Sequence, residues 1–245
     1  MTIDSTRLAW AIAAASDSGG PRSLAGELLR DGADAALRRR WDQGSDGTCQ
    51  AALVLAREMA ERGVGVIVLG DPEYPDRLAE TPTAPPLLFC WGNPALLRMP
   101  GVGMCGSRDV SERGLQAART CGEAVARKGL TVTSGYAKGV DTETHLAALG
   151  QGGRTIIVLA EGFVHFRQKK AFGREGLNAK HVLVLSQFAP SQSWTVGAAM
   201  TRNGVIAGLG QALVVIEAGE TGGTLNAGMQ AIRMGRPVLA HVGTP

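Results

Sequence analysis

The sequence predicts an α/β fold, an extended Rossmann-like, doubly wound and mostly parallel sheet with a small N-terminal helical domain. Short runs of aliphatic and β-branched residues recur along the chain, and helical stretches lie between most of the later runs. The runs are continuously apolar, as in strands that are buried on both faces of a sheet. Glycine supplies 34 of the 245 residues, roughly twice the usual ~7%, as many tight turns require.

Residues 1–46 form the predicted helical domain. Leu8 and Ile12 repeat at helical spacing, and after a break rich in Ser, Asp and Gly a second helix begins at Pro21 or Ser23. A run of arginines and a Gly-containing loop close this part. A pair of helices of this size is either a docking appendage or a weak DNA-contacting module, and the residues leave both open.

Residues 47–245 form the predicted Rossmann-like domain, with helices over residues 53–62 and 111–128. The predicted strands are residues 64–69, 87–91, 102–104, 130–133, 155–159, 182–185, 212–216 and 237–242. In a doubly wound sheet the ligand lies at the carboxyl ends of the strands. We therefore expect the site in the loops that follow them.

Composition and charge exclude several classes of protein. The 25 Lys and Arg against 22 Asp and Glu give a net charge of +3, too small for a protein wrapped in nucleic acid but sufficient for a local basic cleft. The four cysteines are scattered singly, which argues against a disulfide framework or a zinc site. No apolar run approaches the ~18 residues of a membrane span, and no convincing signal peptide is present. We expect a cytoplasmic protein without membrane contact, metal or cofactor.

The segment Gly101-Val-Gly103-Met-Cys-Gly106 spells the G-x-G-x-x-G of a dinucleotide fingerprint. In a true fingerprint the first glycine ends a strand, whereas here the apolar strand lies inside the segment. An acidic residue should also follow roughly 20 positions later to hold the ribose hydroxyls, but the next predicted strand ends in Thr133-Ser134-Gly135. NAD is therefore not expected.

Two junctions between a strand and a helix are predicted phosphate sites. In the first, Gly106-Ser107-Arg108 follows a strand and precedes the helix that begins near Ser111. Backbone N–H groups at a helix start carry partial positive charge, glycine lets an oxyanion approach, and Arg108 adds a two-pronged donor. The alternative to phosphate binding is that Arg108 is an ordinary arginine of a surface loop.

The second junction repeats this pattern after the next predicted strand. Its polar, basic and glycine residues are Ser134, Gly135, Lys138 and Gly139. Asp141 is expected to cap the N-terminus of the following helix, and His145 lies one turn further along. His145 is either a structural histidine or a ligand contact. We expect the two loops to form one anion-binding cleft.

A basic segment covers residues 167–180, where five basic residues against one acid give a net charge of +4. The charged residues are Arg167, Lys169, Lys170, Arg174, Glu175 and Lys180. The segment is either a solvated helix face or a nucleic-acid contact. Phe163 and Phe166 beside it either stack on bases or pack in the core.

Several motifs follow one another in an order and spacing that match one known family. They are Asp71-Pro72-Glu73-Tyr74-Pro75, Pro85-Pro86-Leu87-Leu88-Phe89-Cys90-Trp91-Gly92-Asn93, Gly106-Ser107-Arg108, Ser134-Gly135-Tyr136-Ala137-Lys138-Gly139-Val140-Asp141, Arg202-Asn203 and Gly235-Arg236-Pro237-Val238. Over about two thirds of its length the chain resembles the DNA-processing protein A family, also called DprA or Smf.

The resemblance implies an extended Rossmann fold in which Arg108, Lys138 and Arg202, with Asn203 beside it, line a positive pocket for the backbone of single-stranded DNA. It implies a protein that protects incoming DNA and loads the RecA recombinase in natural transformation or recombination. It further implies a homodimer and a SAM-like domain at residues 1–46. Arg and Lys bind phosphates without reading bases, which suits such a role.

Departures from the family pattern leave a divergent paralogue open. The family's Phe-Pro before Arg202 is Ala199-Met200 here, and its Leu-Asp and Tyr-Pro after Gly162 are replaced by residues 163–167. The family's Ser-Gly-Ser-Leu segment reads Gly222-Gly223-Thr224-Leu225. We also expect no winged helix, of the kind that many relatives carry, within these 245 residues.

Two other functions remain open, although we expect no enzyme activity. A phosphoribohydrolase-like enzyme of the same superfamily would use a Pro-Gly-Gly-x-Gly-Thr-x-x-Glu loop. Gly222-Gly223-Thr224 resembles its middle, but Ala227 stands where the catalytic carboxylate falls, which leaves Glu217 and Glu220 as candidate acids. The second alternative is a sensor that binds a free nucleotide in the cleft and signals by oligomerising.

Self-association is expected through the C-terminal part of the domain, where the last predicted elements are unusually apolar. The apolar residues concerned are Val205, Ile206, Leu209, Met229, Ile232 and Met234. These apolar side chains are more numerous than packing one face of a helix against the sheet requires, which favours a dimer that covers the rest. A buried core helix is the alternative.

Overall fold

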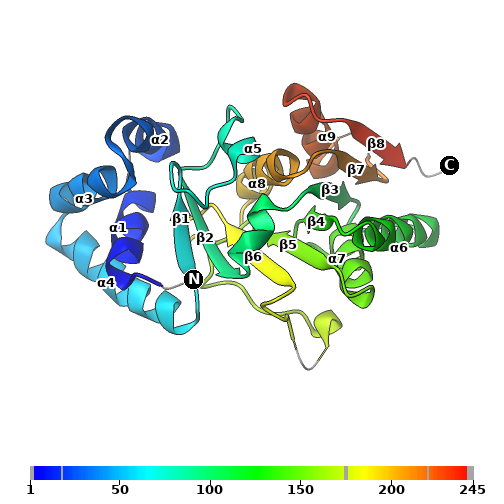
Figure 1. Cartoon of the computed structure of the whole chain (residues 1–245), viewed down its shortest axis with the longest axis horizontal. Helices are drawn as coiled ribbons and strands as arrows, with labels where there is room; N and C mark the ends of the chain where they lie inside the picture. Colours follow the sequence, from blue (N-terminus) through cyan, green and yellow to red (C-terminus); the bar gives the residue numbers. More distant parts are fainter. Residues whose placement is uncertain (1–2, 18, 174–175, 220, 242–245) are drawn as a thin grey trace.

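The computed structural model describes residues 3–17, 19–173, 176–219 and 221–241. Within these residues one eight-stranded sheet, in the order β1-β2-β6-β5-β4-β3-β7-β8, runs between layers of helices (Figure 1). The strands are β1 (Gly65–Val68), β2 (Leu87–Gly92), β3 (Gly101–Gly106), β4 (Thr131–Ser134), β5 (Arg154–Val158), β6 (Val182–Ser186), β7 (Leu213–Ile216) and β8 (Val238–His241).

Each predicted strand is confirmed close to its expected bounds, although residue 242, at the end of the last one, lies outside the described residues. The strands from β3 to β8 pair in parallel. β2 pairs antiparallel with both β1 and β6. The sheet is therefore mostly parallel, as the continuously apolar runs predicted.

Helices cover both faces of the sheet, which makes it doubly wound (Figure 1). Helices α6 (Glu112–Arg127) and α7 (Val140–Gly150) pack together on one face, and α8 (Val196–Leu209) and α9 (Gly223–Arg233) pack together on the other. The short helix α5 (Asp76–Ala79) packs against α8. The fold is α/β and Rossmann-like, as the sequence predicted.

The N-terminal residues fold as helices that lie beside β1 (Figure 1). They are α1 (Ser5–Ala15), α2 (Gly20–Asp31), α3 (Ala33–Gln43) and α4 (Asp46–Glu61). The expected single pair of helices is wrong, because Gly32 alone separates α2 from α3 and its φ of +86° lets the chain turn there. Helix α4 packs mainly against α1, so its contacts place it in this helical layer.

Arg7 of α1 ties the helical layer to the sheet. Its Nη1 and Nη2 donate to the two carboxylate oxygens of Asp71 at 2.9 and 2.6 Å, and its Nε donates to Asp34 at 2.7 Å. The bond to Asp71 raises the pKa of Arg7. Asp71 also accepts from the backbone N–H of Val68, at the end of β1. One hydrophobic core, which includes Leu8, continues from these helices into the sheet.

The order of the strands reverses between β3 and β7. From β3 the chain adds β4, β5 and β6 on one side, and later adds β7 and β8 on the other. In open α/β sheets a ligand crevice forms at such a switch point, outside the carboxyl ends of the strands. Gly106 and Ile216, which end β3 and β7, lie opposite each other in register. The loops that follow these strands are therefore placed to form a site.

The apolar residues expected to support self-association divide between core and surface. Val205, Ile206 and Leu209 of α8 are at most 3% exposed, so they pack against the sheet and cannot reach a partner. Met229 and Ile232 of α9 are 43% and 59% exposed. The expectation is wrong for α8 and stays a prediction for α9.

No helix within the described part of the chain is long and apolar enough to cross a membrane. In that same part, no cluster of three or more His, Cys, Asp or Glu side chains is placed to hold a metal ion. Its cysteines are all free, and burial raises the pKa of the Cys90 and Cys105 thiols to about 12.

Candidate nucleic-acid interface

Two adjoining hollows of about 410 and 400 Å³ lie at the carboxyl ends of the central strands. Both are lined by Arg108, Ala137, Trp194 and Arg202, and we call them together the switch-point crevice. Of the residues predicted to bind phosphate, the crevice brings together Gly106, Ser107, Arg108, Lys138, Asp141, Lys169, Arg202 and Asn203.

The two predicted phosphate loops are in direct contact. The backbone N–H of Val140 donates to the carbonyl of Ser107 at 3.3 Å, and the Ser107 hydroxyl accepts from the N–H of Asp109 at 3.1 Å. Gly139 has a φ of +76° and passes against the Ser107 and Arg108 carbonyls, so a side chain there would clash. The loops therefore form one cleft, as the sequence predicted.

Arg108 is exposed and stacks on an aromatic ring. The carbon at the centre of its guanidinium lies 5.5 Å from the centroid of Trp194, which is itself 44% exposed. A guanidinium over a ring face is held by the cation–π attraction and keeps its N–H donors available in its own plane. Arg108 is therefore oriented and still able to bind a phosphate.

Lys138 lies at the exposed rim of the crevice. Its Nζ is 2.6 Å from the carboxylate of Asp109, and this bond lowers the pKa of Asp109. Because both side chains are largely exposed, water screens the pair and a phosphate can compete for the ammonium group.

Arg202 lies under the crevice, with its side chain only 9% exposed. Its Nη1 donates to the Val158 carbonyl at 2.8 Å and lies 4.0 Å from the Asp141 carboxylate. Burial lowers its pKa, and its Nε has no hydrogen-bond partner among the described residues. Arg202 is thus a fixed, incompletely bonded cation at the base of the site.

Asp141 organises the loop after β4 and does not cap α7, so that expectation is wrong. The N-cap of α7 is Gly139. The Asp141 carboxylate accepts from the Ala137 N–H at 3.1 Å and from the Ser134 hydroxyl at 3.2 Å. Gly135 is required at its position, because a Cβ there would overlap the carboxylate of Asp141 and a guanidinium nitrogen.

His145 is a structural histidine, so its inclusion among the phosphate-binding residues is corrected. The side chain is fully buried, with Nε2 2.7 Å from the Gly135 carbonyl and Nδ1 2.6 Å from the Thr155 hydroxyl. Burial lowers the pKa of His145 to about 4. With both ring nitrogens occupied, His145 supports the Gly135 loop from below.

The N-terminus of α6 is occupied by groups of the protein itself. The Ser111 hydroxyl accepts from the Gly114 N–H, and the Glu217 carboxylate accepts from the N–H and hydroxyl of Ser111. These bonds lower the pKa of Glu217, whose φ of +52° puts its backbone in the left-handed region. The expectation of a phosphate on this helix start is corrected, because Ser111 and Glu217 already occupy it. The candidate anion-binding groups are then the side chains of the loops.

Of the two candidate acids of a nucleotide hydrolase, the structure describes Glu217, which lines one hollow of the crevice. Glu217 is held as a carboxylate by Ser111. Ala227 is fully buried in α9, so its position faces the core instead of the crevice. Glu220 lies outside the described residues.

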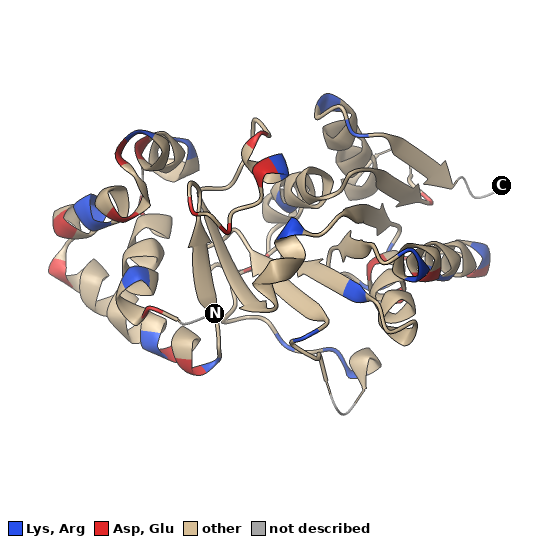
Figure 2. Cartoon of the chain, viewed as in Figure 1, with Lys and Arg blue, Asp and Glu red and all other residues tan. Residues whose placement is uncertain are grey.

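The described residues of the basic segment 167–180 form a loop with one short turn, η2 (Lys170–Phe172), so the helix-face alternative is wrong for them. Lys169 Nζ donates to the Tyr136 carbonyl at 2.7 Å and lies 4.4 Å from that ring's centroid. Burial lowers the pKa of Lys169. Arg174 and Glu175 lie outside the described residues. In Figure 2 the described part of this loop has blue Lys and Arg positions and no red Asp or Glu position.

The remaining predicted residues have different positions. Lys170 is exposed and lines neither hollow of the crevice, and Arg167 lies in a separate pocket. Phe163 is 1% exposed in the core, whereas Phe166 is half-buried with its ring 5.5 Å from that of Tyr136. Base stacking by the face of Phe163 is therefore ruled out.

Asn203 and Trp194 complete the walls. Asn203 Nδ2 donates to the Gly223 carbonyl at 2.9 Å, which fixes the loop after β7. Trp194 was missed by reading the sequence, although one signal for it exists. Trp194 stands directly after Ser191, Gln192 and Ser193 in a chain with 4% aromatic residues, and a tryptophan in such a polar stretch is typical of a partly exposed ring.

The fold and the crevice define a class: Rossmann-like α/β proteins with a cationic crevice at the topological switch point. Residues 65–245 match the family model described as DNA recombination-mediator protein A. The chain belongs to that family.

Curated relatives include the DNA processing protein DprA of Bacillus subtilis, 32% identical over 188 residues, and that of Streptococcus pneumoniae, 36% identical over 171 residues. The matches cover 75% and 70% of this chain but 62% and 60% of those relatives. The chain thus spans about 60% of the length of these relatives.

Solved structures are also similar. The X-ray structure of Streptococcus pneumoniae DprA aligns with a TM-score of 0.75 and 28% identity, over 100% of this chain and 88% of that one. A Helicobacter pylori DNA processing protein A, described for its single-stranded DNA binding mode, aligns with a TM-score of 0.62 over 71% of this chain and 80% of its own. At 22% identity the second likeness concerns the fold alone.

Proposed function

We propose that this protein binds single-stranded DNA in the switch-point crevice, protects incoming DNA and loads the RecA recombinase in natural transformation or recombination. The observation that carries the proposal is the convergence of Arg108, Lys138 and Arg202 on one crevice. Membership of the DNA recombination-mediator protein A family supports it.

The chemistry of the crevice suits a ligand made of phosphates and bases. Arg108 and Lys138 at the mouth neutralise phosphates without selecting a base. Arg202 lies deeper and adds a cation whose position is fixed by the Val158 carbonyl. The ring of Trp194, which is 44% exposed, offers a face on which any base can stack. A strand would therefore bind with little base preference.

The buried residues have positioning roles in this proposal. Asp141 and His145 hold the Gly135 loop over Arg202, and Glu217 fixes the start of α6 beside Arg108. None of these three touches the DNA. They keep the cations in place before the strand arrives, so less ordering is needed when it binds.

The dimer belongs to the same proposal. Leu225, Met229 and Ile232 share one face of α9 and are 41%, 43% and 59% exposed, and Leu239 on the neighbouring β8 is 57% exposed. Apolar side chains gathered in this way favour a protein contact. A second copy of the chain would cover them and bring two crevices into one assembly.

A competition titration tests the proposal. A labelled oligothymidine is bound to the protein and displaced by unlabelled oligothymidine, by duplex DNA of equal length, or by nucleoside monophosphates. We expect the single strand to compete far better than the duplex and the monophosphates to compete poorly. Monophosphates that compete as well as the oligonucleotide would overturn the proposal and favour the nucleotide sensor.

RecA loading is tested separately, by whether the protein accelerates RecA filament formation on DNA coated with single-strand-binding protein.

A further inference from the structure

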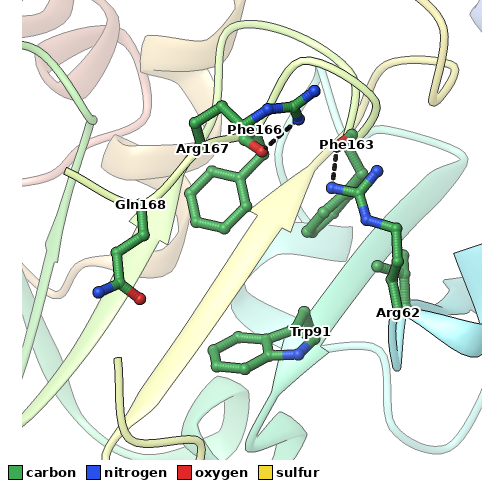
Figure 3. A pocket seen from close by; sticks show the side chains of 7 residues that line it. Arg62, Trp91, Phe163, Phe166, Arg167 and Gln168 are labelled. Atoms are coloured by element: carbon green, nitrogen blue, oxygen red, sulfur yellow. Dashed lines mark hydrogen bonds between the residues drawn. The ribbon is translucent and has the colours of Figure 1, made fainter. Parts of the chain in front are cut away.

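A pocket of about 480 Å³ lies outside the switch-point crevice, between the helical layer and the loop after β5. The residues that line it and carry the argument are Arg62, Trp91, Phe163 through its carbonyl, Phe166, Arg167 and Gln168 (Figure 3). We call it the Trp91 pocket. Its size is within the range of sites that hold small organic groups.

Three separate parts of the fold build the Trp91 pocket. Arg62 ends helix α4, Trp91 belongs to β2, and Phe166 follows β5 in the chain. Figure 3 shows Trp91 on one side of the opening and Phe166 with Arg167 on the other, while Arg62 and Gln168 lie at its two ends. A flat group entering the pocket would therefore meet aromatic rings on two sides.

Backbone carbonyls hold both guanidinium groups at the wall. Arg62 Nη2 donates to the Phe163 carbonyl at 2.7 Å, and Arg167 Nη1 donates to the carbonyls of Val164 and Phe166 at 2.8 and 2.9 Å. Each guanidinium has five N–H donors, so both keep donors for a ligand. Arg62 also lies 3.5 Å from the exposed Glu58, a pair that solvent screens.

The lining selects the chemistry of its occupant. Among the described residues that line the pocket there is no Asp or Glu, so its charge is positive. Aromatic rings beside guanidinium groups suit a planar base that carries a phosphate. Gln168 Oε1 accepts from the Leu177 N–H, so the Nε2 group of this amide remains available as a donor to a phosphate oxygen.

The Trp91 pocket and the crevice share one wall. Phe166 lines the pocket, and its ring lies 5.5 Å from that of Tyr136, which lines the crevice. Gln168 in the pocket is followed directly by Lys169 in the crevice. A strand that leaves the crevice beside Lys169 therefore meets Arg167 next.

We propose that the Trp91 pocket holds one base of the DNA strand whose phosphates cross the switch-point crevice, with Arg62 and Arg167 on its flanking phosphates. This inference rests on the proposed function. The Trp91 pocket would be a second binding site for the strand, on the far side of the loop after β5. It would hold a base by stacking on its face and not by hydrogen bonds to its edge. Such a site holds a strand of any sequence and limits its sliding.

The test scans a single abasic unit along an oligothymidine, and uses 2-aminopurine as a fluorescent base. We expect one position at which loss of the base weakens binding about tenfold, and at which 2-aminopurine is quenched on binding. Trp91→Leu should abolish both effects, whereas Trp91→Phe should retain most of each. Arg62→Gln should weaken binding of strands that reach the pocket, whereas Arg57→Gln is the matched control, because Arg57 is exposed on the same helix and does not line the pocket.

The outcomes separate this inference from the proposed function. If Arg108→Glu weakens binding but the abasic scan is flat and Trp91→Leu binds like the parent, the crevice binds DNA and the Trp91 pocket does not. If the unmodified protein fails to bind oligothymidine, the proposed function itself is wrong. An abasic effect that persists in Trp91→Leu assigns the base to another ring and overturns the inference.

Discussion

Arg202 Nη1 lies 4.0 Å from Asp141 Oδ2 beneath the Gly135 backbone, so the deepest cation of the crevice already has an anionic neighbour. The pair is buried, and removal of either charge would leave the other uncompensated. Substitutions of Arg202 therefore test folding as well as binding. The exposed cations Arg108 and Lys138 report on binding with less disturbance of the fold.

Arg108→Glu and Lys138→Glu should each weaken binding of single-stranded DNA by about 2 to 4 kcal/mol, from charged hydrogen bonds of ~1.5 to 3 kcal/mol plus the added repulsion. Fluorescence anisotropy with a labelled oligothymidine measures the loss. Arg38→Glu is the matched reversal, because Arg38 is 70% exposed on α3, away from the crevice. Asp109→Asn should strengthen binding, because it frees Lys138. If both crevice variants stay folded by circular dichroism and bind like the parent, the crevice is not the DNA site.

Binding should weaken steeply with salt. If about four to six phosphates are neutralised, the slope of log K against log salt is about −3 to −4, at about −0.7 per phosphate for a single strand. Titrations at increasing NaCl give the slope directly. A flat salt response would contradict binding through the phosphate backbone.

The free energy of unfolding should fall as the pH drops from about 6.5 toward 4. His145 has a pKa of about 4 in the folded protein against 6.5 when solvated, so the unfolded chain takes up the proton first. The loss approaches about 3 kcal/mol at the acid end of this window. Urea unfolding at a series of pH values measures it, and His145→Asn should flatten the curve across the same window. An identical pH curve for the variant would show that His145 is not the responsible group.

Ile232→Glu and Met229→Glu on α9 should shift the protein toward monomer, because each puts a charge into an apolar contact. Light scattering at micromolar concentration, with and without DNA, measures the change. Leu29→Glu is the control, since Leu29 is 69% exposed on α2, in the other part of the molecule. A parent protein that is a monodisperse monomer in both conditions would refute the dimer.

Purified protein should release no base from nucleoside 5′-monophosphates. Ala227 supplies no acid and is fully buried, and the Glu217 carboxylate is held by Ser111. Chromatography of the reaction mixture detects any free base. Turnover that disappears in Glu217→Ala would establish an enzyme and displace the DNA-binding proposal.

The strands and the position of the site were predictable because each depends on local pattern. A continuous apolar run identifies a buried strand, and the parallel arrangement places the loops after β3 and β4 at one edge of the sheet. Gly106-Ser107-Arg108 and the loop that carries Lys138 could therefore be located from the sequence.

Side-chain partners could not be predicted, because they come from distant parts of the chain. Asp141 was expected to cap its own helix but lies beside Arg202, and Glu217 reaches Ser111 on α6. His145 has the same sequence signature whether it is buried or exposed, and only the packing of β5 behind it decides. The role of Trp91 on β2 gave no signal either, because its pocket needs Arg62 from the end of helix α4.

The two edges of the sheet differ in what they offer to another copy of the chain. The helices α1–α4 lie beyond β1 and are linked to the sheet through Arg7 and Asp71, whereas among the described residues β8 pairs with β7 alone. A sheet with two exposed edge strands can add copies at both edges and polymerise. A sheet with one exposed edge strand can pair only with the same edge strand of a second copy, which gives a closed dimer. With helices lying beyond β1, any pairing of two copies through the sheet would use the β8 edge of each.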